Sequence, residues 1–139
     1  MAYISTQDIQ ATLDKQLKTI VDLPTFYSEN FFAQQNGKSV FCRSTLAPAK
    51  SVIISMGTKK VVEQTGLYQV DLFHPVDFGY APGRILADKV INAFLPGFLT
   101  LSSGDQLIIH TAWSQPAMND QSAFLMIPVL VEWVIRNQV

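Results

Sequence analysis

The chain has 139 residues, of which 48% are hydrophobic and 15% are charged, with a formal net charge of −1 and a pI near 6.0. This length suffices for one globular domain over residues 1–139 with its own core, and the charge balance argues against a nucleic-acid-binding domain, which normally has a basic face. The charged share lies well below the usual share of about 25%, which favours a subunit that covers part of its surface by association.

The chain carries no pattern that predicts export or insertion into a membrane. Its N-terminus lacks the basic segment and apolar run of a signal peptide. Residues 124–135 form the most apolar stretch, which is shorter than the roughly 20 residues of a membrane helix and contains Pro128 and Glu132. Cys42 is the single cysteine and cannot form an intrachain disulfide. We expect no membrane partner and a buried strand position for Cys42.

The first predicted element is an amphipathic helix over residues 6–21, with Ser5 as a cap and Pro24 beyond its end. Its apolar residues recur at helical steps: Ile9, Leu13, Leu17, Ile20 and Val21. Residues 25–30 are short and β-prone, and residues 34–37 predict a polar turn.

Residues 40–73 predict a long meander or hairpin. A strand over residues 40–46 is closed by Pro48, and residues 51–56 predict a second strand. Residues 57–60 (GTKK) would form the turn at its tip.

Residues 66–97 hold the clearest sequence pattern, in the form of a strand, a loop and a helix. Tyr68, Val70 and Leu72 alternate with polar residues and predict a strand with one buried face. His74-Pro75 ends it, and residues 77–84 predict an exposed loop. A helix follows before Pro96-Gly97, and its apolar stripe comprises Ala87, Val90, Ile91, Phe94 and Leu95.

Three further strands complete the predicted order. Residues 98–101 and 106–113 form two strands joined by a Ser-Ser-Gly-Asp turn, and residues 124–136 form a long final strand. The odd positions of this strand are all apolar: Leu125, Ile127, Val129, Val131, Trp133 and Ile135. The order predicts an α+β fold, in which two helices pack on a mainly antiparallel β-sheet.

Candidate catalytic and metal sites have simpler structural explanations. Asp71, His74 and Asp77 resemble metal ligands only in residue type, because an odd spacing on a strand sends successive side chains to opposite faces. We interpret them as a solvated strand edge and turn. His110 has no paired nucleophile and is predicted to lie at the surface, and residues 57–60 lack the second glycine of a phosphate-binding loop. We therefore predict no enzyme activity, no catalytic residue, no cofactor and no metal.

The best candidates for function are surface residues that could contact a partner. An aromatic-rich stretch includes Glu29, Asn30, Phe31 and Phe32. The remaining candidates come from the predicted hairpin tip and the predicted loop: Lys59, Lys60, Asp77, Tyr80 and Arg84.

Short motifs over nearly the whole chain resemble a family of small tailed-phage and prophage proteins, the tail terminator-like or tail-completion proteins. The matching residues are Ser28 to Phe32, Phe41 to Arg43, Leu46 to Ala49, Gly66 to Phe73, Pro75, Gly79, Ala87-Asp88, Phe94, Pro96-Gly97, Ile127 to Val129 and Trp133. The segment over residues 50–65 departs from the family's usual length.

This resemblance implies a tail-terminator-like fold with a protruding hairpin and a homo-oligomeric, hexameric ring in the virion tail, assembled in the cytoplasm of the bacterial host. It further implies that the ring caps the tail tube protein, ends tube polymerisation and offers a surface to the neck or connector protein, while DNA passes through without specific binding. Members of the family have no catalytic residues to carry over. A neck or head-completion adaptor of the same virion is an alternative, and a small-ligand-binding or enzymatic α+β domain is another.

Overall fold

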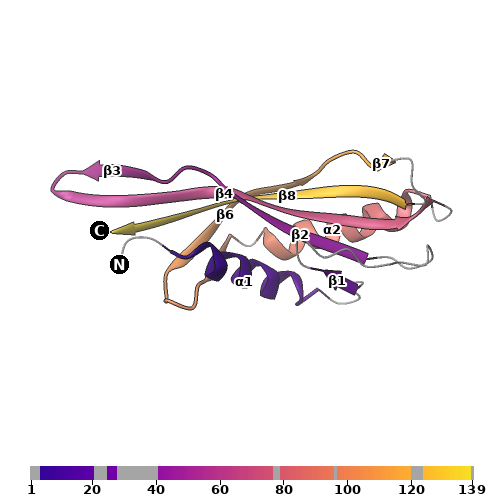
Figure 1. Ribbon diagram of the computed structural model, residues 1–139, viewed down its shortest axis with the longest axis horizontal. Coiled ribbons are helices and arrows are strands. Elements are labelled where there is room, and N and C mark those ends of the chain that lie inside the picture. The colour runs from indigo at the N-terminus through magenta and orange to yellow at the C-terminus, as the bar shows by residue number, and fades with distance from the viewer. Residues whose placement is uncertain are drawn as a thin grey trace.

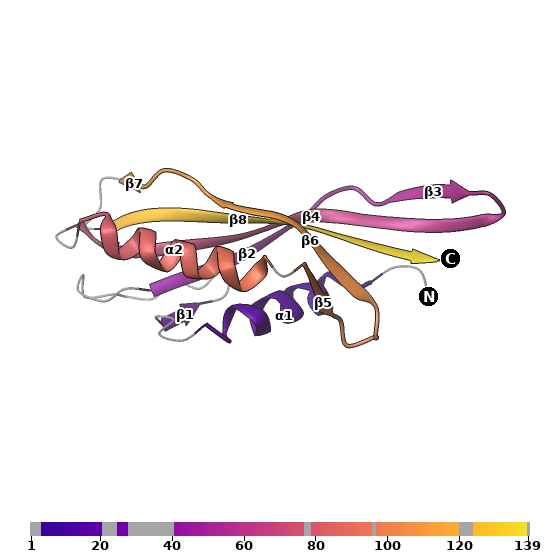
Figure 2. The ribbon, with the colours of Figure 1, turned by 180° about the vertical axis from the view of Figure 1, so that it is seen from behind.

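The computed structural model describes residues 4–20, 25–27, 41–76, 79–95, 97–119 and 124–138. A long twisted sheet carries both helices on one face (Figure 1, and from behind in Figure 2). The elements are, in chain order, α1 (Thr6–Leu17), β1 (Thr25–Tyr27), β2 (Phe41–Pro48), β3 (Val52–Met56), β4 (Lys59–Pro75), α2 (Ala81–Phe94), β5 (Phe98–Thr100), β6 (Gln106–Ser114), β7 (Met118–Asn119) and β8 (Phe124–Gln138).

The strands form one sheet in the order β1-β2-β4-β8-β6-β5, with β3 beside β4 and β7 beside β8. All pairs are antiparallel except β1 with β2. The two longest strands, β4 and β8, pair with each other at the centre of the sheet. Val61 lies opposite Gln138 at one end of this pairing, and Pro75 lies opposite Phe124 at the other. The α+β fold predicted from the sequence is confirmed.

The predicted hairpin is present and projects from the body of the molecule. β2 and β3 pair with successive parts of β4, and Ala49 N–H donates to Thr65 O at 2.8 Å between them. Together with the C-terminal end of β8, β3 and the start of β4 extend past the helices (Figures 1 and 2). We call this projection the arm: β3, residues 59–63 of β4 and residues 136–138 of β8.

The turn at the tip of the arm is shorter than the four residues predicted. Gly57 has a φ of 64° and forms the turn with Thr58 alone. Lys59 already lies in β4, opposite Met56, and Lys60 lies opposite Ser55.

The core lies between the helices and one face of the sheet. Most residues of the predicted helical stripes and the alternating residues of β4 and β8 meet there. The following are at most 2% exposed: Ile9, Leu13, Leu17, Tyr68, Val70, Leu72, Ala87, Val90, Phe94, Ile127, Val129, Val131, Trp133 and Ile135. Of the other predicted stripe residues, Ile20 and Ile91 are partly buried, and Val21 lies outside the described residues. Ser5 caps α1 as predicted, since its side chain accepts from the N–H of Gln7 at 3.2 Å.

Both helices differ from the prediction at their ends. The prediction extended the first helix to residue 21, but α1 ends at Leu17 and is followed by a turn and a bend over residues 18–20. α2 begins at Ala81 with Pro82 in its first turn, where a proline needs no N–H partner, so the loop predicted over residues 77–84 was wrong from Ala81 onward. Leu95 is 53% exposed, because one residue beyond Phe94 the helix has turned by about 100° away from the core.

Pro128 explains why β6 and β7, which both pair with the same edge of β8, are separate strands. It lies within β8 opposite Asp71 and has no N–H with which to continue a second ladder. Its carbonyl accepts from Gln115 N–H at 2.9 Å, and residues 115–117, between β6 and β7, form no strand. The sheet is therefore regular on the β4 side of Pro128 and broken on the other.

Candidate assembly surface

The structure separates the surface residues predicted from the sequence. Glu29, Asn30, Phe31, Phe32 and Asp77 lie outside the described residues. Lys60 is exposed on the arm, and Lys59 lies beside it in β4.

Tyr80 and Arg84 lie at the start of α2, at the opposite end of the molecule from the arm (Figure 2). β4 alone separates the two ends by about 54 Å, taking the usual rise per residue. The predicted set is therefore not one patch.

The start of α2 does bring two predicted residues together. Arg84 Cζ lies 5.6 Å from the centre of the Tyr80 ring, which is 52% exposed, and this geometry suits a cation–π contact. Ile85 beside them is 60% exposed. Arg84 also lines a shallow hollow with Asp88 and residues 114–117, where α2 meets the β6–β7 connection. This end presents mixed apolar and charged groups suited to a protein partner.

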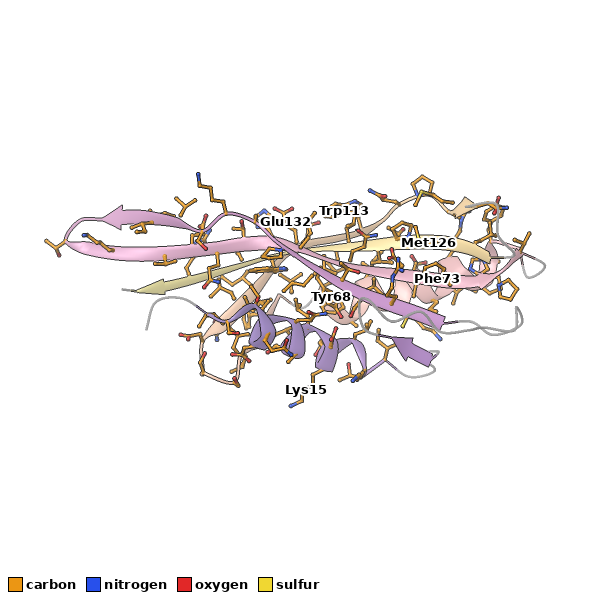
Figure 3. The ribbon with its side chains drawn as sticks, in the orientation of Figure 1. Lys15, Tyr68, Phe73, Trp113, Met126 and Glu132 are labelled. Atoms are coloured by element: carbon orange, nitrogen blue, oxygen red, sulfur yellow. The ribbon has the colours of Figure 1, made fainter. Side chains whose placement is uncertain are left out.

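The face of the sheet opposite the helices is a surface that the sequence reasoning missed. No helix of the described chain lies on it, and Figure 3 shows Trp113 and Glu132 on this side, away from α1 and its outward-pointing Lys15. Trp113 of β6 and its partner Leu130 of β8 both point to this face, as does Val134. Trp113 is 37% exposed there, while Leu130 and Val134 are 8% and 7% exposed. We call this the bare face.

The residue types at the even positions of β8 could have predicted this surface from the sequence. A strand with one side in water normally alternates apolar and polar residues. Met126, Leu130 and Val134 are instead apolar at even positions, as the odd ones are. On this side of β8 these apolar residues stand beside Glu132 and Arg136, and no helix of the described chain covers them.

A half-buried carboxylate lies at a hollow in the bare face. Glu132 lines the hollow with Trp113 and Leu67, together with Ala49, Thr65 and Gly66. Among the described residues its carboxylate makes no hydrogen bond or ion pair. The hollow therefore combines an apolar wall with an unneutralised negative charge, which suits the amphipathic side chain of a lysine or arginine.

Asp71 lies in a buried network on the bare face and not at the solvated edge predicted from the sequence. It is 2% exposed, accepts from Arg43 Nη2 at 3.0 Å and from Gln69 Nε2 at 2.7 Å. Arg43 Cζ also lies 5.3 Å from the centre of the Phe73 ring. The prediction was wrong because the neighbouring strand supplies an arginine from 28 residues earlier in the chain.

His74 is also buried, at 1% exposure, and is not part of a solvated turn. Its Nε2 lies 2.8 Å from Gly79 O. A Cβ at position 83 would lie 2.5 Å from His74 Cε1, so α2 can pack this closely only with glycine there. The imidazole thus fixes the start of α2 against the end of β4.

Metal-binding and thiol chemistry can be examined among the described residues. They contain no group of three or more His, Cys, Asp or Glu able to hold a metal ion. Cys42 is buried, as predicted, and burial, with a smaller effect of the Asp14 carboxylate, raises the pKa of its thiol to about 12. No helix in the described part of the chain is long and apolar enough to span a bilayer.

The chain thus folds as a long sheet with two helices on one face, a bare opposite face and a projecting arm. Residues 8–133 match the family described as phage tail terminator protein, and the chain belongs to that family. It is therefore a structural protein of a phage tail and a virion component, as the resemblance predicted.

Solved structures agree with the fold, although no curated protein matches the chain. One structure, which carries no functional description, has a TM-score of 0.71 at 16% identity and covers 96% of each chain. A chain from the virion of a native gene transfer agent particle has a TM-score of 0.67 at 17% identity, covering 98% of this chain and all of the other.

Proposed function

We propose that this protein forms a closed ring that caps the phage tail tube, ends its polymerisation and presents a surface for attachment of the neck. The observation that carries the proposal is the uneven covering of the sheet. Both helices protect one face, while the other exposes Trp113 and leaves Glu132 without a partner among the described residues. Such a face is satisfied by assembly rather than by the protein's own fold.

The shape of the molecule supports a ring. A closed ring needs two different, complementary surfaces on each subunit, joined head to tail. The arm and the start of α2 lie at opposite ends of the long axis, so they can contact different neighbours (Figures 1 and 2). Six copies is the number that the family resemblance implies.

In this proposal the partners are other copies of the chain, the tail tube protein and the neck or connector protein. DNA passes through the ring without specific recognition, in keeping with the net charge of −1. The proposal contains no catalytic step and no cofactor, and it places the protein in the virion tail after assembly in the bacterial cytoplasm.

Two experiments test the proposal. Negative-stain electron microscopy and light scattering of the purified protein, alone and with tail tubes, should show rings. Deletion of its gene from the phage should give tails of uncontrolled length that fail to join heads. A strict monomer at high concentration, together with normal tails in the deletion, would refute it.

A neck or head-completion adaptor is the second candidate, because it needs the same head-to-tail assembly surfaces. The deletion separates the two candidates. Loss of an adaptor leaves tails of normal length that do not join heads, whereas loss of a terminator alters tail length itself. Electron microscopy of labelled protein in the virion gives its position directly.

A further inference from the structure

Several strand edges lack a partner within the described chain, and two of them, on β3 and on residues 111–114 of β6, lie on opposite edges of the sheet. β3 pairs with β4 on one side only. β5 covers Gln106 to Ile108 of β6, but residues 111–114 of β6 pair only with β8. An open strand edge exposes a row of main-chain N–H and C=O groups that can pair with another strand.

Neither edge carries a charged residue or a proline, two features that oppose strand addition, and a β-bulge lies between Ile109 and Thr111, beside the edge on β6. Residues 52–56 (VIISM) and 111–114 (TAWS) contain no charged residue and no proline. Ile53 is 66% exposed and Val52 is 49% exposed, and Trp113 is 37% exposed on the other edge. Both edges therefore offer main-chain groups together with apolar side chains.

The two edges run in opposite directions. Across the sheet the strands β3, β4, β8 and β6 are each antiparallel to the next, so β3 is antiparallel to β6. When copies are placed side by side in the same orientation, β3 of one copy meets β6 of the next as an antiparallel pair. Such a pair joins two different surfaces of the subunit, as head-to-tail ring closure requires, through the antiparallel ladder that is slightly more stable per residue.

We propose that the subunits of the ring are joined by strand pairing between the β3 edge of one copy and the residue 111–114 edge of β6 in the next. The partner is a second copy of this chain, because one subunit supplies both edges in the correct relative direction. The proposal rests on the proposed ring and names the surface that closes it.

The register of the sheet gives this joint a defined stagger. On one edge, Ile54 in the middle of β3 lies opposite Val61 of β4. On the other edge, Ala112 of β6 lies opposite Val131 of β8, and Val131 in turn lies opposite Tyr68 of β4. The two edges are thus offset by seven residues along β4, from 61 to 68.

An offset of this size corresponds to about 23 Å along the strands, over a width of about 19 Å for four strands. The strands of a closed ring would then tilt by about 50° from its axis, close to the roughly 35–45° of closed barrels. The stagger is therefore compatible with closure.

The hairpin turn identifies the main-chain groups that take part. The two-residue turn makes Met56 and Lys59 its closing hydrogen-bonded pair. Alternation along the ladder then directs the N–H and C=O of Ile53 and Ser55 toward the open edge. These two amides should exchange hydrogen rapidly in the free subunit and at least about tenfold more slowly in the ring.

The first test is hydrogen exchange of the wild-type protein as a ring and, after dilution, as free subunits. Slow exchange at Ile53 and Ser55 in the ring alone supports the proposal. Rings in which these amides still exchange rapidly would overturn the strand joint while leaving the proposed function standing. Absence of any ring would remove both.

The second test places a charge on the open edge. Ile53→Lys should raise the concentration needed for ring formation at least about tenfold, because a charged side chain opposes strand addition. Leu95→Lys is the matched control, since Leu95 is 53% exposed just after the C-terminal end of α2, outside the two edges and outside the surface at the start of α2. Circular dichroism checks that each variant is folded, and if Ile53→Lys does not fold, the exchange measurement decides. Loss of rings in Leu95→Lys but not in Ile53→Lys would contradict the proposal.

Discussion

Gln64 binds the main chain of Ile4 with both atoms of its side-chain amide. Ile4 N–H donates to Gln64 Oε1 at 2.7 Å, and Gln64 Nε2 donates to Ile4 O at 3.0 Å. Both residues are 4% exposed, so water cannot replace either bond. The side chain therefore acts as a strand partner for the N-terminal segment where β4 enters the arm.

Gln64→Leu should lower the free energy of unfolding by about 1–3 kcal/mol, because it leaves a buried N–H and a buried C=O without partners. Urea denaturation measures the change. Gln106→Leu is the control, since Gln106 is exposed on β6. Equal stability of the Gln64 variant and the wild type would show that the two bonds contribute nothing.

Tyr68→Phe should also destabilise the protein. The Tyr68 hydroxyl donates to the Asp14 carboxylate and joins α1 to β4. Its loss should cost about 1.5–3 kcal/mol, the usual range for a hydrogen bond to a charged group. Tyr80→Phe, which changes an exposed tyrosine, should have no effect in the same denaturation experiment.

Arg43→Met and Arg136→Met should have unequal effects. Arg43 pairs with Asp71, which is 2% exposed, and its removal leaves a buried carboxylate with only Gln69, at a cost of about 3 kcal/mol. Arg136 pairs with Glu63 at 2.8 Å, but its side chain is 56% exposed, so its loss should cost less than about 1 kcal/mol. Similar losses in thermal unfolding would contradict this difference.

The stability of the protein should fall above about pH 9. Burial raises the pKa of Cys42 from 9.0 to about 12, and burial beside Asp14 raises that of Tyr68 above its usual 10.0. Because the unfolded chain loses these protons first, their contribution is full below about pH 9 and is lost as the pH rises. Cys42→Ala should reduce the slope by up to about 1.4 kcal/mol per pH unit between pH 9 and 12. An unchanged slope would contradict the prediction.

Trp113 should report assembly through its fluorescence. The chain has two tryptophans, and Trp133 is 1% exposed while Trp113 is 37% exposed. If the ring covers the bare face and the β6 edge, acrylamide quenching should decrease on assembly. Trp113→Phe should abolish this response, and quenching that is identical in rings and free subunits would place the interface elsewhere.

The sequence alone determined the regular elements of this protein and which of their sides face the core. The two-residue period of Tyr68, Val70 and Leu72 and the three- and four-residue steps of Ile9, Leu13 and Leu17 are local consequences of strand and helix geometry. Their burial is confirmed. Family membership followed from motifs spread along the same elements.

Only the tertiary structure decided how these elements meet. Asp71 and His74 looked solvated because Arg43 and Gly83, which cover them, come from other elements. The open edges on β3 and β6, and their opposite directions, likewise depend on which strands pair across the sheet. Local periodicity shows that a strand has a buried side, but only the long-range pairing determines which of its edges remains open to another copy.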